Sequence, residues 1–307
     1  MKNVGASVRA RLADLGRADG VGLDFMIERF AIGRLLFRIS MCLQADRFIL
    51  KGAQLFTMWE RNPHRPTRDI DFLGFGDPAL EPMEAFFREL LEVPADPEDG
   101  LIWGEPSASA IRDDQRYGGI RIVVPVSLAG ARARIQIDIG FGDAVTPGPE
   151  EHIWHELLGY PAAKLRTYPP ETVIAEKLEA AVQLDIGNSR MKDFYDLDWL
   201  ARHRIFDFEV LQNAIIRTFE NRQTELPLEV PFALTEAFSS DAGKQIQWNA
   251  FLRKNRLEAR PLDQVIARIR GFLLPVFSRH PSHRSITWQP DTGWVESSFP
   301  TKDFTKD

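Results

Sequence analysis

The 307-residue sequence contains one cysteine, Cys42, which excludes an intramolecular disulfide and is typical of a protein from a reducing compartment. No stretch approaches the roughly 20 consecutive apolar residues that a membrane-spanning helix requires. Residues 1–20 mix Lys, Arg, Asp and Gly, and they lack the apolar core of a signal peptide. We therefore expect a cytoplasmic protein that has no membrane partner.

An excess of positive charge is also missing, since 44 acidic residues against 38 Lys and Arg give a formal net charge of −6. Any contact with a nucleic acid would have to use a local basic patch on an acidic background. The hydrophobic content of 44% and the charged content of 27% are those of an ordinary globular protein. The length is sufficient for one large domain or two moderate ones.

The most informative stretch that is present runs from Arg65 to Leu73 and contains Asp69-Ile70-Asp71. In a strand, alternation would place Asp69 and Asp71 on one face and Ile70 on the other. Two adjacent carboxylates repel each other, and a bound cation reverses that cost. A strand with this pattern holds Mg²⁺ in many phosphoryl-transfer enzymes. The alternative is a pair of solvated acids on an edge strand.

A short strand and a glycine turn precede this stretch. Residues 24–45 carry an apolar stripe with helical spacing and predict a long helix, and an apolar run then ends at Lys51-Gly52-Ala53. Residues 53–59 predict a short helix. A strand, a glycine turn and a helix N-terminus together offer backbone N–H groups to phosphate, although such turns often only change the direction of the chain.

A third carboxylate lies on a second predicted strand. Residues 78–93 predict an amphipathic helix, and strands follow over 101–111, 119–128 and 131–141, with Ala129-Gly130 as a tight hairpin turn. Within 131–141 the isoleucines share one face, and Asp138 lies on the polar face. Asp138 is therefore either a third acid beside Asp69 and Asp71 or an exposed acid at the end of a strand.

The character of the chain changes after Pro147-Gly148-Pro149. We expect a mixed α/β domain over residues 1–150, a helical domain over 151–280 and an irregular tail over 281–307. Residues 164–168 predict an additional edge strand. Helices are predicted over 170–182, 189–200, 208–219 and 262–277, and Trp248 and Phe251 are predicted to hold the helices together.

Lys177 lies within the apolar stripe of the helix over 170–182. A buried ammonium needs a partner, unless its stem packs and its end reaches water. The next helix carries Asp193 and Asp196, which flank its apolar face. Their alternative role is to interact favourably with the helix dipole near its start, and this applies most to Asp193.

Taken in order, five sequence blocks resemble those of the AbiEii/AbiGii (MenT-like) nucleotidyltransferase toxins, which belong to the polymerase-β-type nucleotidyltransferase superfamily. The resemblance extends from about Phe25 to Leu200. The blocks are Leu50-Lys51-Gly52, Arg65-x-Thr67-Arg68-Asp69-Ile70-Asp71-Phe72, Ile137-Asp138-Ile139-Gly140, Ile174-Ala175-Glu176-Lys177-Leu178 and Lys192-Asp193-Phe194-Tyr195-Asp196-Leu197.

The resemblance implies an α+β fold, with a mixed nucleotidyltransferase sheet and flanking helices followed by an α-helical bundle region. It implies that Asp69, Asp71 and Asp138 are Mg²⁺ ligands and that the turn over residues 51–53 contacts the phosphates of a substrate NTP. Family members commonly have Gly or Ser where this chain has Ala53. Only backbone donors are therefore present at that position.

The resemblance further implies that Lys177 and Asp193 act in catalysis. Lys177 would contact a phosphate oxygen as a point charge, and Asp193, or Asp196 in its place, would orient Lys177 or the nucleotide. Arg65 and Arg68 flank the second block, where they would contact phosphates or remain solvated.

Known members of this family act as toxins with an antitoxin encoded alongside, and some add nucleotides to the acceptor end of tRNA. The implied function is Mg²⁺-dependent transfer of NMP to RNA, with tRNA as the acceptor and a winged-helix, AbiEi-like protein as the antitoxin. Alternatives are transfer to a protein or a small molecule, NTP-dependent phosphotransfer, and a catalytically silent nucleotide-binding module. The candidate RNA contacts are Arg112, Arg116, Arg121, Arg132, Arg134, Lys254, Arg256 and Arg260.

Overall fold

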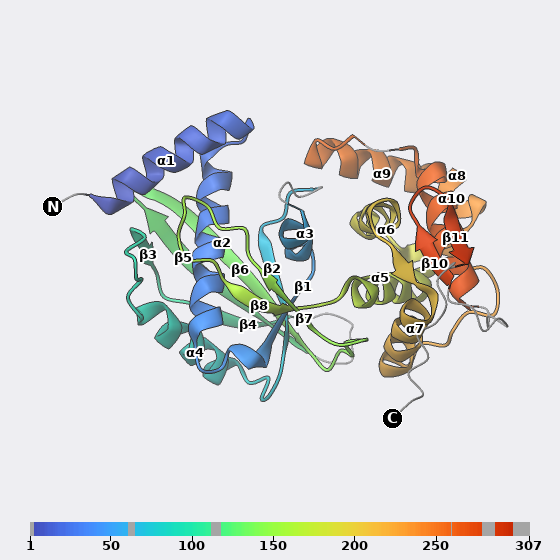
Figure 1. The fold of residues 1–307 in the computed structure, drawn as a ribbon, viewed down its shortest axis with the longest axis horizontal. Helices are drawn as coiled ribbons and strands as arrows, with labels where there is room; N and C mark the ends of the chain where they lie inside the picture. The colour runs from blue at the N-terminus through green and yellow to red at the C-terminus, as the bar shows by residue number, and fades with distance from the viewer. Residues whose placement is uncertain (1–2, 61–64, 112–117, 259, 278–285, 297–307) are drawn as a thin grey trace, which may run out of the picture. The chain divides into compact units, whose positions relative to one another are not determined.

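The computed structural model describes residues 3–60, 65–111, 118–258, 260–277 and 286–296 (Figure 1). The chain forms two compact units, and the boundary between them along the sequence differs from the predicted one. The first unit comprises Met1–Asp143 and Pro149–Tyr168, and the second comprises Ala144–Gly148 and Pro169–Asp307. Residues 149–168 lie in the first unit because their strands join its sheet, so the division falls near residue 168 rather than 150.

The first unit is built on an eight-stranded mixed sheet with the order β3-β5-β6-β2-β1-β8-β7, in which β4 also pairs with β5. The pairs β2–β6 and β1–β8 are parallel, and the other pairs are antiparallel. The strands are β1 (Phe48–Lys51), β2 (Asp69–Gly74), β3 (Leu101–Trp103), β4 (Ser107–Ile111), β5 (Gly119–Leu128), β6 (Ala131–Phe141), β7 (Glu150–Ile153) and β8 (Lys164–Thr167).

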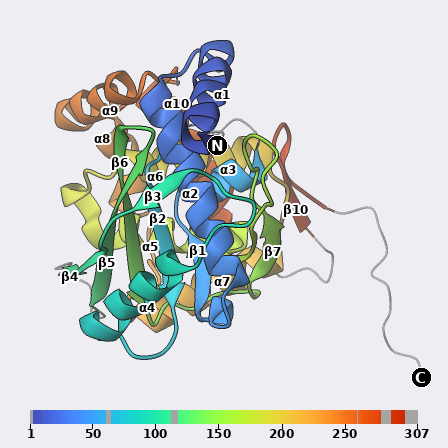
Figure 2. The same ribbon diagram turned by 90° about the vertical axis from the view of Figure 1, so that its left-hand side faces the viewer.

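Most of these strands were predicted from alternation, and the β5–β6 hairpin is confirmed (Figure 2). Its turn residues, Ala129 and Gly130, have φ angles of +46° and +84°, as expected for the turn type that best matches strand twist. The strand predicted over 164–168 is not at the edge, because β8 lies between β1 and β7. The short strand β7 was not predicted.

One face of the sheet is apolar and is covered by helices. Ile70 and Phe72 of β2 are buried there beside Ile137 and Ile139 of β6, as alternation predicts. In Figure 1, α2 passes in front of this sheet, and α4 packs on it through Phe86, whose ring centroid lies 5.4 Å from that of Phe48 on β1. The helices of this unit are α1 (Val4–Asp19), α2 (Leu23–Met41), α3 (Gln54–Trp59) and α4 (Leu80–Glu92), and a 3-10 turn, η1 (Ala45–Arg47), precedes β1.

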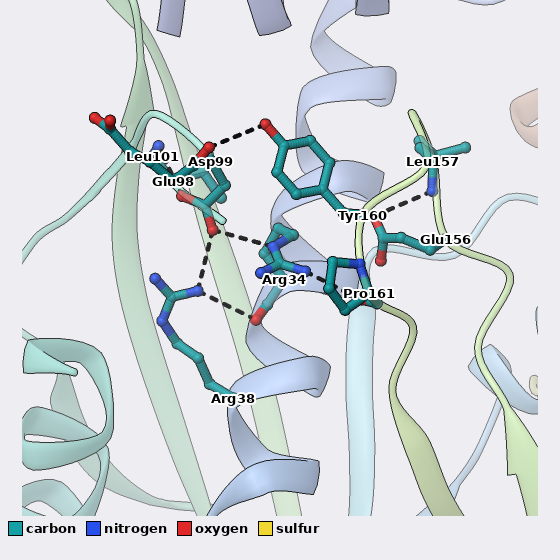
Figure 3. A network of polar contacts seen from close by, with 9 residues as sticks. All are labelled: Arg34, Arg38, Glu98, Asp99, Leu101, Glu156, Leu157, Tyr160 and Pro161. Carbon is teal, nitrogen blue, oxygen red and sulfur yellow. Dashed lines mark hydrogen bonds and ion pairs between the residues drawn. The ribbon is translucent and has the colours of Figure 1, made fainter. Parts of the chain in front are cut away.

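A buried polar network attaches α2 to the loops around it (Figure 3). Asp99 accepts a hydrogen bond from Arg34 Nε at 3.1 Å and from Arg38 Nη1 at 3.2 Å. Glu156 packs against the same helix, since a Cβ at Gly33 would lie 2.6 Å from Glu156 Oε2. Burial raises the pKa of Glu156 to about 7, against the opposing effect of a hydrogen bond from the Leu157 amide.

The second unit is mainly helical, as predicted. Its helices are α5 (Pro170–Leu184), α6 (Met191–His203), α7 (Phe208–Arg222), α8 (Glu236–Ser240), α9 (Ala242–Asn255) and α10 (Leu262–Leu273), with 3-10 turns η2 (Asp185–Gly187), η3 (Phe232–Leu234) and η4 (Leu274–Phe277). Trp248 and Phe251 of α9 pack on Tyr195 of α6, with ring centroids 6.2 and 5.6 Å apart. The predicted role of these two aromatic residues in holding the helices together is thus supported.

The predicted irregular tail is partly wrong. Within it, β10 (Ile286–Gln289) and β11 (Gly293–Glu296) form a small sheet with β9 (Phe206–Asp207). Trp288 is buried, and its Nε1 donates to the Ala201 carbonyl at 2.7 Å, which fixes the hairpin to the end of α6. Residues 281–285 and 297–307 lie outside the described residues. Among the described residues, no helix is both long and apolar enough to cross a membrane.

Candidate active site

The polar face of the sheet carries a row of four charged residues on adjacent strands. In the register of the sheet, Lys51 of β1 faces Asp71 of β2, Asp71 faces Asp138 of β6, and Asp138 faces Arg121 of β5. Asp71 and Asp138 therefore occupy the middle of the row, with Lys51 at one end and Arg121 at the other. The prediction that Asp138 lies beside Asp71 on a neighbouring strand is confirmed.

Gly52 lets the Asp71 carboxylate rest directly against the backbone at the end of β1. Gly52 has a φ of +70°, and a Cβ placed there would lie 2.0 Å from Asp71 Oδ2. Both conditions exclude any other residue, since L side chains rarely adopt this φ and no Cβ tolerates this approach. The requirement for glycine thus comes partly from the position of Asp71, 19 residues further along the chain on β2.

The helix that follows this turn supports the start of β2. Gln54, the first residue of α3, is 2% exposed, and its Nε2 donates to the backbone carbonyl of Asp69 at 3.2 Å. Ala53 has αR backbone angles and supplies no side-chain cap to α3, in line with the expectation that only backbone donors are present there. No pattern in the sequence predicts the role of Gln54, because its partner is a backbone carbonyl, which every residue carries.

The Asp138 carboxylate is held by Arg121. Arg121 Nε donates to Oδ1 and Arg121 Nη2 donates to Oδ2, both at 2.8 Å, and Gln136 Nε2 donates to Oδ2 at 3.2 Å. Both oxygens of Asp138 are thus engaged within the protein. Arg121 had been selected only as a possible RNA contact, yet its partner follows from the hairpin: with Ala129 and Gly130 as the turn, counting back along both strands places 121 opposite 138.

Lys51 is held at the other end of the row. Its Nζ lies 2.6 Å from Asp143 Oδ2 and 5.2 Å from the centre of the Tyr168 ring, and both side chains of the ion pair are largely buried. Asp143, two residues beyond the end of β6, was not identified in the sequence. Asp143 thus forms an ion pair with Lys51, the residue of β1 that faces Asp71 in the register of the sheet.

The donor set that fits a divalent cation consists of Asp69 and Asp71. They are two residues apart on one strand, with Asp69 exposed and Asp71 half-buried, and Mg²⁺ is usually held by one or two carboxylates together with substrate phosphates. In the part of the chain that is described, no group of three His, Cys, Asp or Glu side chains is arranged to hold a metal ion. The bidentate pair with Arg121 explains why Asp138 does not complete such a group.

The two arginines that flank Asp69 differ in exposure. Arg68 is exposed, and its Nε lies 3.1 Å from Glu28 Oε2 on α2. Burial raises the pKa of Glu28, and the positive charge of Arg68 opposes this rise. Arg65 is half-buried, and a phosphate contact from either arginine stays a prediction.

In the second unit, Lys177 is at the centre of a buried ion cluster. Its Nζ lies 2.6 Å from Asp193 Oδ1 and 2.8 Å from Asp196 Oδ2, and Arg190 Nε lies 2.6 Å from Asp193 Oδ2. The side chain of Lys177 is 12% exposed and that of Asp196 is fully buried. Lys177 therefore does not extend into water, and both acids proposed as its partner contact it.

Electrostatics keeps Asp193 ionised although it is buried. Burial acts to raise the pKa of Asp193, but the charges of Lys177 and Arg190, with the hydrogen bond from Lys177, outweigh it and lower the pKa. Arg190 was not identified in the sequence, although its spacing of three residues before Asp193 is that of neighbours on one helix face. The cluster lies in the second unit and the carboxylate row in the first, so their joint action on one nucleotide stays a prediction.

The predicted RNA contacts fall into four groups. Arg112 and Arg116 lie outside the described residues, and Arg121 is engaged with Asp138. Arg132 and Arg134 are exposed at the start of β6. The remaining candidates are exposed at or just beyond the C-terminal end of α9, namely Lys254, Arg256 and Arg260.

Comparison with known proteins identifies one family. Residues 34–268 match the family described as nucleotidyl transferase AbiEii toxin, type IV toxin–antitoxin system. No curated protein matches the chain. Among solved structures, JHP933 from Helicobacter pylori is 17% identical, with a TM-score of 0.46 over 77% of this chain and 84% of that one. A second H. pylori protein, provisionally assigned as a nucleotidyltransferase, is 16% identical, with a TM-score of 0.42 over 80% of this chain and 95% of that one.

Proposed function

The chain belongs to the AbiEii family of nucleotidyltransferase toxins from type IV toxin–antitoxin systems, and we propose that it transfers NMP from an NTP to RNA in a Mg²⁺-dependent reaction. We propose the 3′ end of tRNA as the acceptor. The observation that carries the proposal is the approach of the Asp71 carboxylate to Gly52, beside Asp69, on the polar face of the sheet.

In the proposed reaction, a 3′-hydroxyl of the acceptor attacks the α-phosphorus of the NTP, the bond to the β-phosphate breaks and pyrophosphate leaves. Asp69 and Asp71 would hold Mg²⁺, which supplies positive charge to the triphosphate and to the leaving pyrophosphate. The backbone of the turn over residues 51–53 would contact the phosphates.

Asp138 would position the attacking hydroxyl as the neighbour of Asp71 across the sheet. Both oxygens of Asp138 already accept hydrogen bonds from Arg121, so we expect the proton of the hydroxyl to pass to solvent. If Asp138 is instead the third metal ligand, it has to release Arg121. Asp138→Asn would separate these roles, since the amide still orients a hydroxyl but is a poor ligand for Mg²⁺.

Lys177 would present its ammonium to a phosphate oxygen of the nucleotide. The support for this role is that Asp193 and Asp196 fix the ammonium from the protein side, which orders the side chain before a ligand arrives. Asp193 and Asp196 would thus share the orienting role, and Arg190 would hold Asp193 in place.

The acceptor and the regulating partner follow from the family. For RNA we propose the exposed cations Arg132, Arg134 and Lys254, for which no ion pair occurs among the described residues. A cognate antitoxin, proposed as a winged-helix, AbiEi-like protein, would limit the activity in the cytoplasm.

One labelling experiment tests the proposal. Purified protein is incubated with Mg²⁺, total cellular RNA and total cellular protein, and with each NTP labelled at either the α- or the γ-phosphate. We expect α-label in the tRNA fraction together with pyrophosphate. Label from the γ-phosphate would identify a phosphotransferase, α-label in protein or small molecules would replace the RNA acceptor, and no label with any NTP would indicate a silent binding module.

A further inference from the structure

Lys244, in the first turn of α9, is almost completely buried. The residue is 7% exposed, and its Nζ donates to the backbone carbonyl of Asn188 at 2.8 Å. Its ammonium also lies 5.4 Å from the centre of the Phe238 ring. Among the described residues, no carboxylate forms an ion pair with it. Burial of Lys244 is energetically unfavourable, since a buried ammonium without a counter-charge is less stable than an apolar side chain of the same size.

The carbonyl that Lys244 contacts belongs to the loop that leads into α6. Asn188 is 1% exposed, and its Oδ1 accepts a hydrogen bond from the Arg190 amide at 2.8 Å. The amide of Asn188 in turn donates to the Asp185 carbonyl at 3.1 Å. Asn188 therefore has its backbone fixed on two sides, and its side chain fixes the residue two positions further along.

Arg190 connects this loop to the Lys177 cluster. Its Nε lies 2.6 Å from Asp193 Oδ2, and the other oxygen of Asp193 lies 2.6 Å from Lys177 Nζ. A continuous series of polar contacts thus runs from Lys244 through the loop of residues 188–190 to Asp193 and Lys177. The series crosses from α9 to α6 and α5 within the second unit.

The first turn of α9 holds Lys244 in register with its partner. The Lys244 amide donates to Asp241 Oδ1 at 2.9 Å, so Asp241 caps the helix at the residue that reaches Asn188. Phe238, on which the ammonium lies, packs against Phe194 of α6 with ring centroids 5.1 Å apart. Backbone and ring contacts therefore restrict the position of the ammonium.

We infer that Lys244 is a positioning residue for the proposed nucleotidyl transfer: it fixes the loop of residues 188–190 so that Arg190 and Asp193 hold Lys177 in its reactive position. The inference rests on the function proposed above, and it assigns Lys244 no contact with the substrate. Small displacements of an orienting group reduce the rate of the chemical step more than they reduce ground-state binding.

The variant that tests this is Lys244→Met, which keeps the unbranched stem and removes the donor. The matched control is Gln247→Met, at an exposed polar residue on the same helix. For Lys244→Met we expect kcat for nucleotidyl transfer to fall about tenfold or more, with KM for the NTP within about twofold of wild type, since misplacement by an ångström can cost up to about 100-fold. Gln247→Met should keep the wild-type kcat.

A second variant approaches the same loop from the other side. Asn188→Ala leaves the carbonyl that Lys244 contacts and removes the Oδ1 acceptor of the Arg190 amide. We expect the same loss of kcat, and we expect Lys244→Met to add little to it in the double variant, because both act through one loop. Independent, multiplying losses in kcat would overturn the inference.

Hydrogen exchange of the peptide that spans residues 188–193 gives a measure that does not depend on activity. The exchange rate should rise in Lys244→Met relative to Gln247→Met, and an unchanged rate would overturn the inference. If wild-type protein transfers no nucleotide, the proposed function fails, and the exchange comparison still decides whether Lys244 holds the loop. If wild-type protein is active and folded Lys244→Met retains full kcat, the inference fails by itself.

Discussion

The two charged regions differ in how their charges are balanced. In the second unit, two cations and two carboxylates, Lys177, Arg190, Asp193 and Asp196, form a cluster in which each acid contacts a cation within 2.8 Å. In the first unit, Asp69 is exposed and Asp71 is half-buried on one strand face, and Lys51 and Arg121, at the two ends of the charged row, form ion pairs with Asp143 and Asp138.

The two regions also differ in burial, and burial affects how strongly each should respond to the loss of one member. A balanced buried cluster is fixed by its own contacts and loses stability when one member is removed. Asp69 and Asp71 lie on one strand face, and Gly52 allows the Asp71 carboxylate to lie against the backbone of β1. Two acids placed so close to each other gain from an added cation. We therefore expect substitutions in the first region to affect activity most strongly and substitutions in the second to affect both activity and stability.

The largest effect is expected for Asp71→Ala. Loss of one of the two carboxylates proposed to bind Mg²⁺ should lower the initial rate of pyrophosphate release by about 10³-fold or more, since charge stabilisation of the transition state contributes several kcal/mol. The melting temperature of Asp71→Ala should be measured alongside the rate, so that a loss of activity through unfolding is recognised. Asp77→Ala, which removes an exposed acid just beyond β2, serves as the control. Full activity in Asp71→Ala would exclude this metal site.

Lys177→Met should reduce both transfer and stability. Its removal leaves two buried carboxylates with Arg190, which we expect to destabilise the fold by about 3–5 kcal/mol. The measurement is denaturant unfolding at pH 7 alongside the transfer assay. Adding Asp196→Asn should restore part of the stability but not the activity. If Lys177→Met kept both its transfer activity and its stability, the proposed difference between the two charged regions would be wrong.

Gly52→Ala is expected to lose transfer and about 1–3 kcal/mol of stability, because the new methyl group meets Asp71 and the φ of +70° is strained. Gly20→Ala is the matched control. Gly20 has a φ of +68° with no atom within 4 Å of an added Cβ, so it experiences the strain alone. The difference between the two variants in unfolding free energy therefore measures the contact with Asp71. Equal losses of unfolding free energy in the two variants would show that the contact between the added methyl group and Asp71 does not affect stability.

The smallest effect is expected for Glu156→Gln, which compares a half-buried acid of the first unit with the ion-paired acids of the Lys177 cluster. The pKa of Glu156 is raised from 4.5 to about 7 in the folded protein, so the unfolded chain loses this proton first. Wild-type stability should fall as the pH rises from about 4.5 to about 7, by about 1–3 kcal/mol. Glu156→Gln should lack this decrease and be the more stable protein at pH 8.

Thermal unfolding from pH 5 to pH 8 measures this difference. Gln keeps the oxygen that accepts the Leu157 amide, so that hydrogen bond does not confound the comparison. A difference in melting temperature that does not change with pH would contradict the raised pKa.

Much of the fold could be predicted because its signals are local. The period-two pattern of Ile135, Ile137 and Ile139 gave the strand and its faces, and Ala129-Gly130 gave the hairpin register that puts Asp138 opposite Arg121. The irregular tail was wrong because β10 is stabilised by β9 and by the burial of Trp288, contacts about 80 residues away along the chain. The early domain boundary was wrong for the same reason, since β8 belongs with β1 only through long-range pairing.

By itself, the sequence determined which residues carry charge and which strand face each of them occupies. Alternation places Asp69 and Asp71 together, and the helical stripe places Lys177 among apolar residues, because these periods follow from backbone geometry. The tertiary structure alone decided the partners: Asp71 against Gly52, Lys51 with Asp143, and Lys177 between Asp193 and Asp196. Charges separated along the chain come together only when the sheet and the helices pack, and local sequence does not encode those distances.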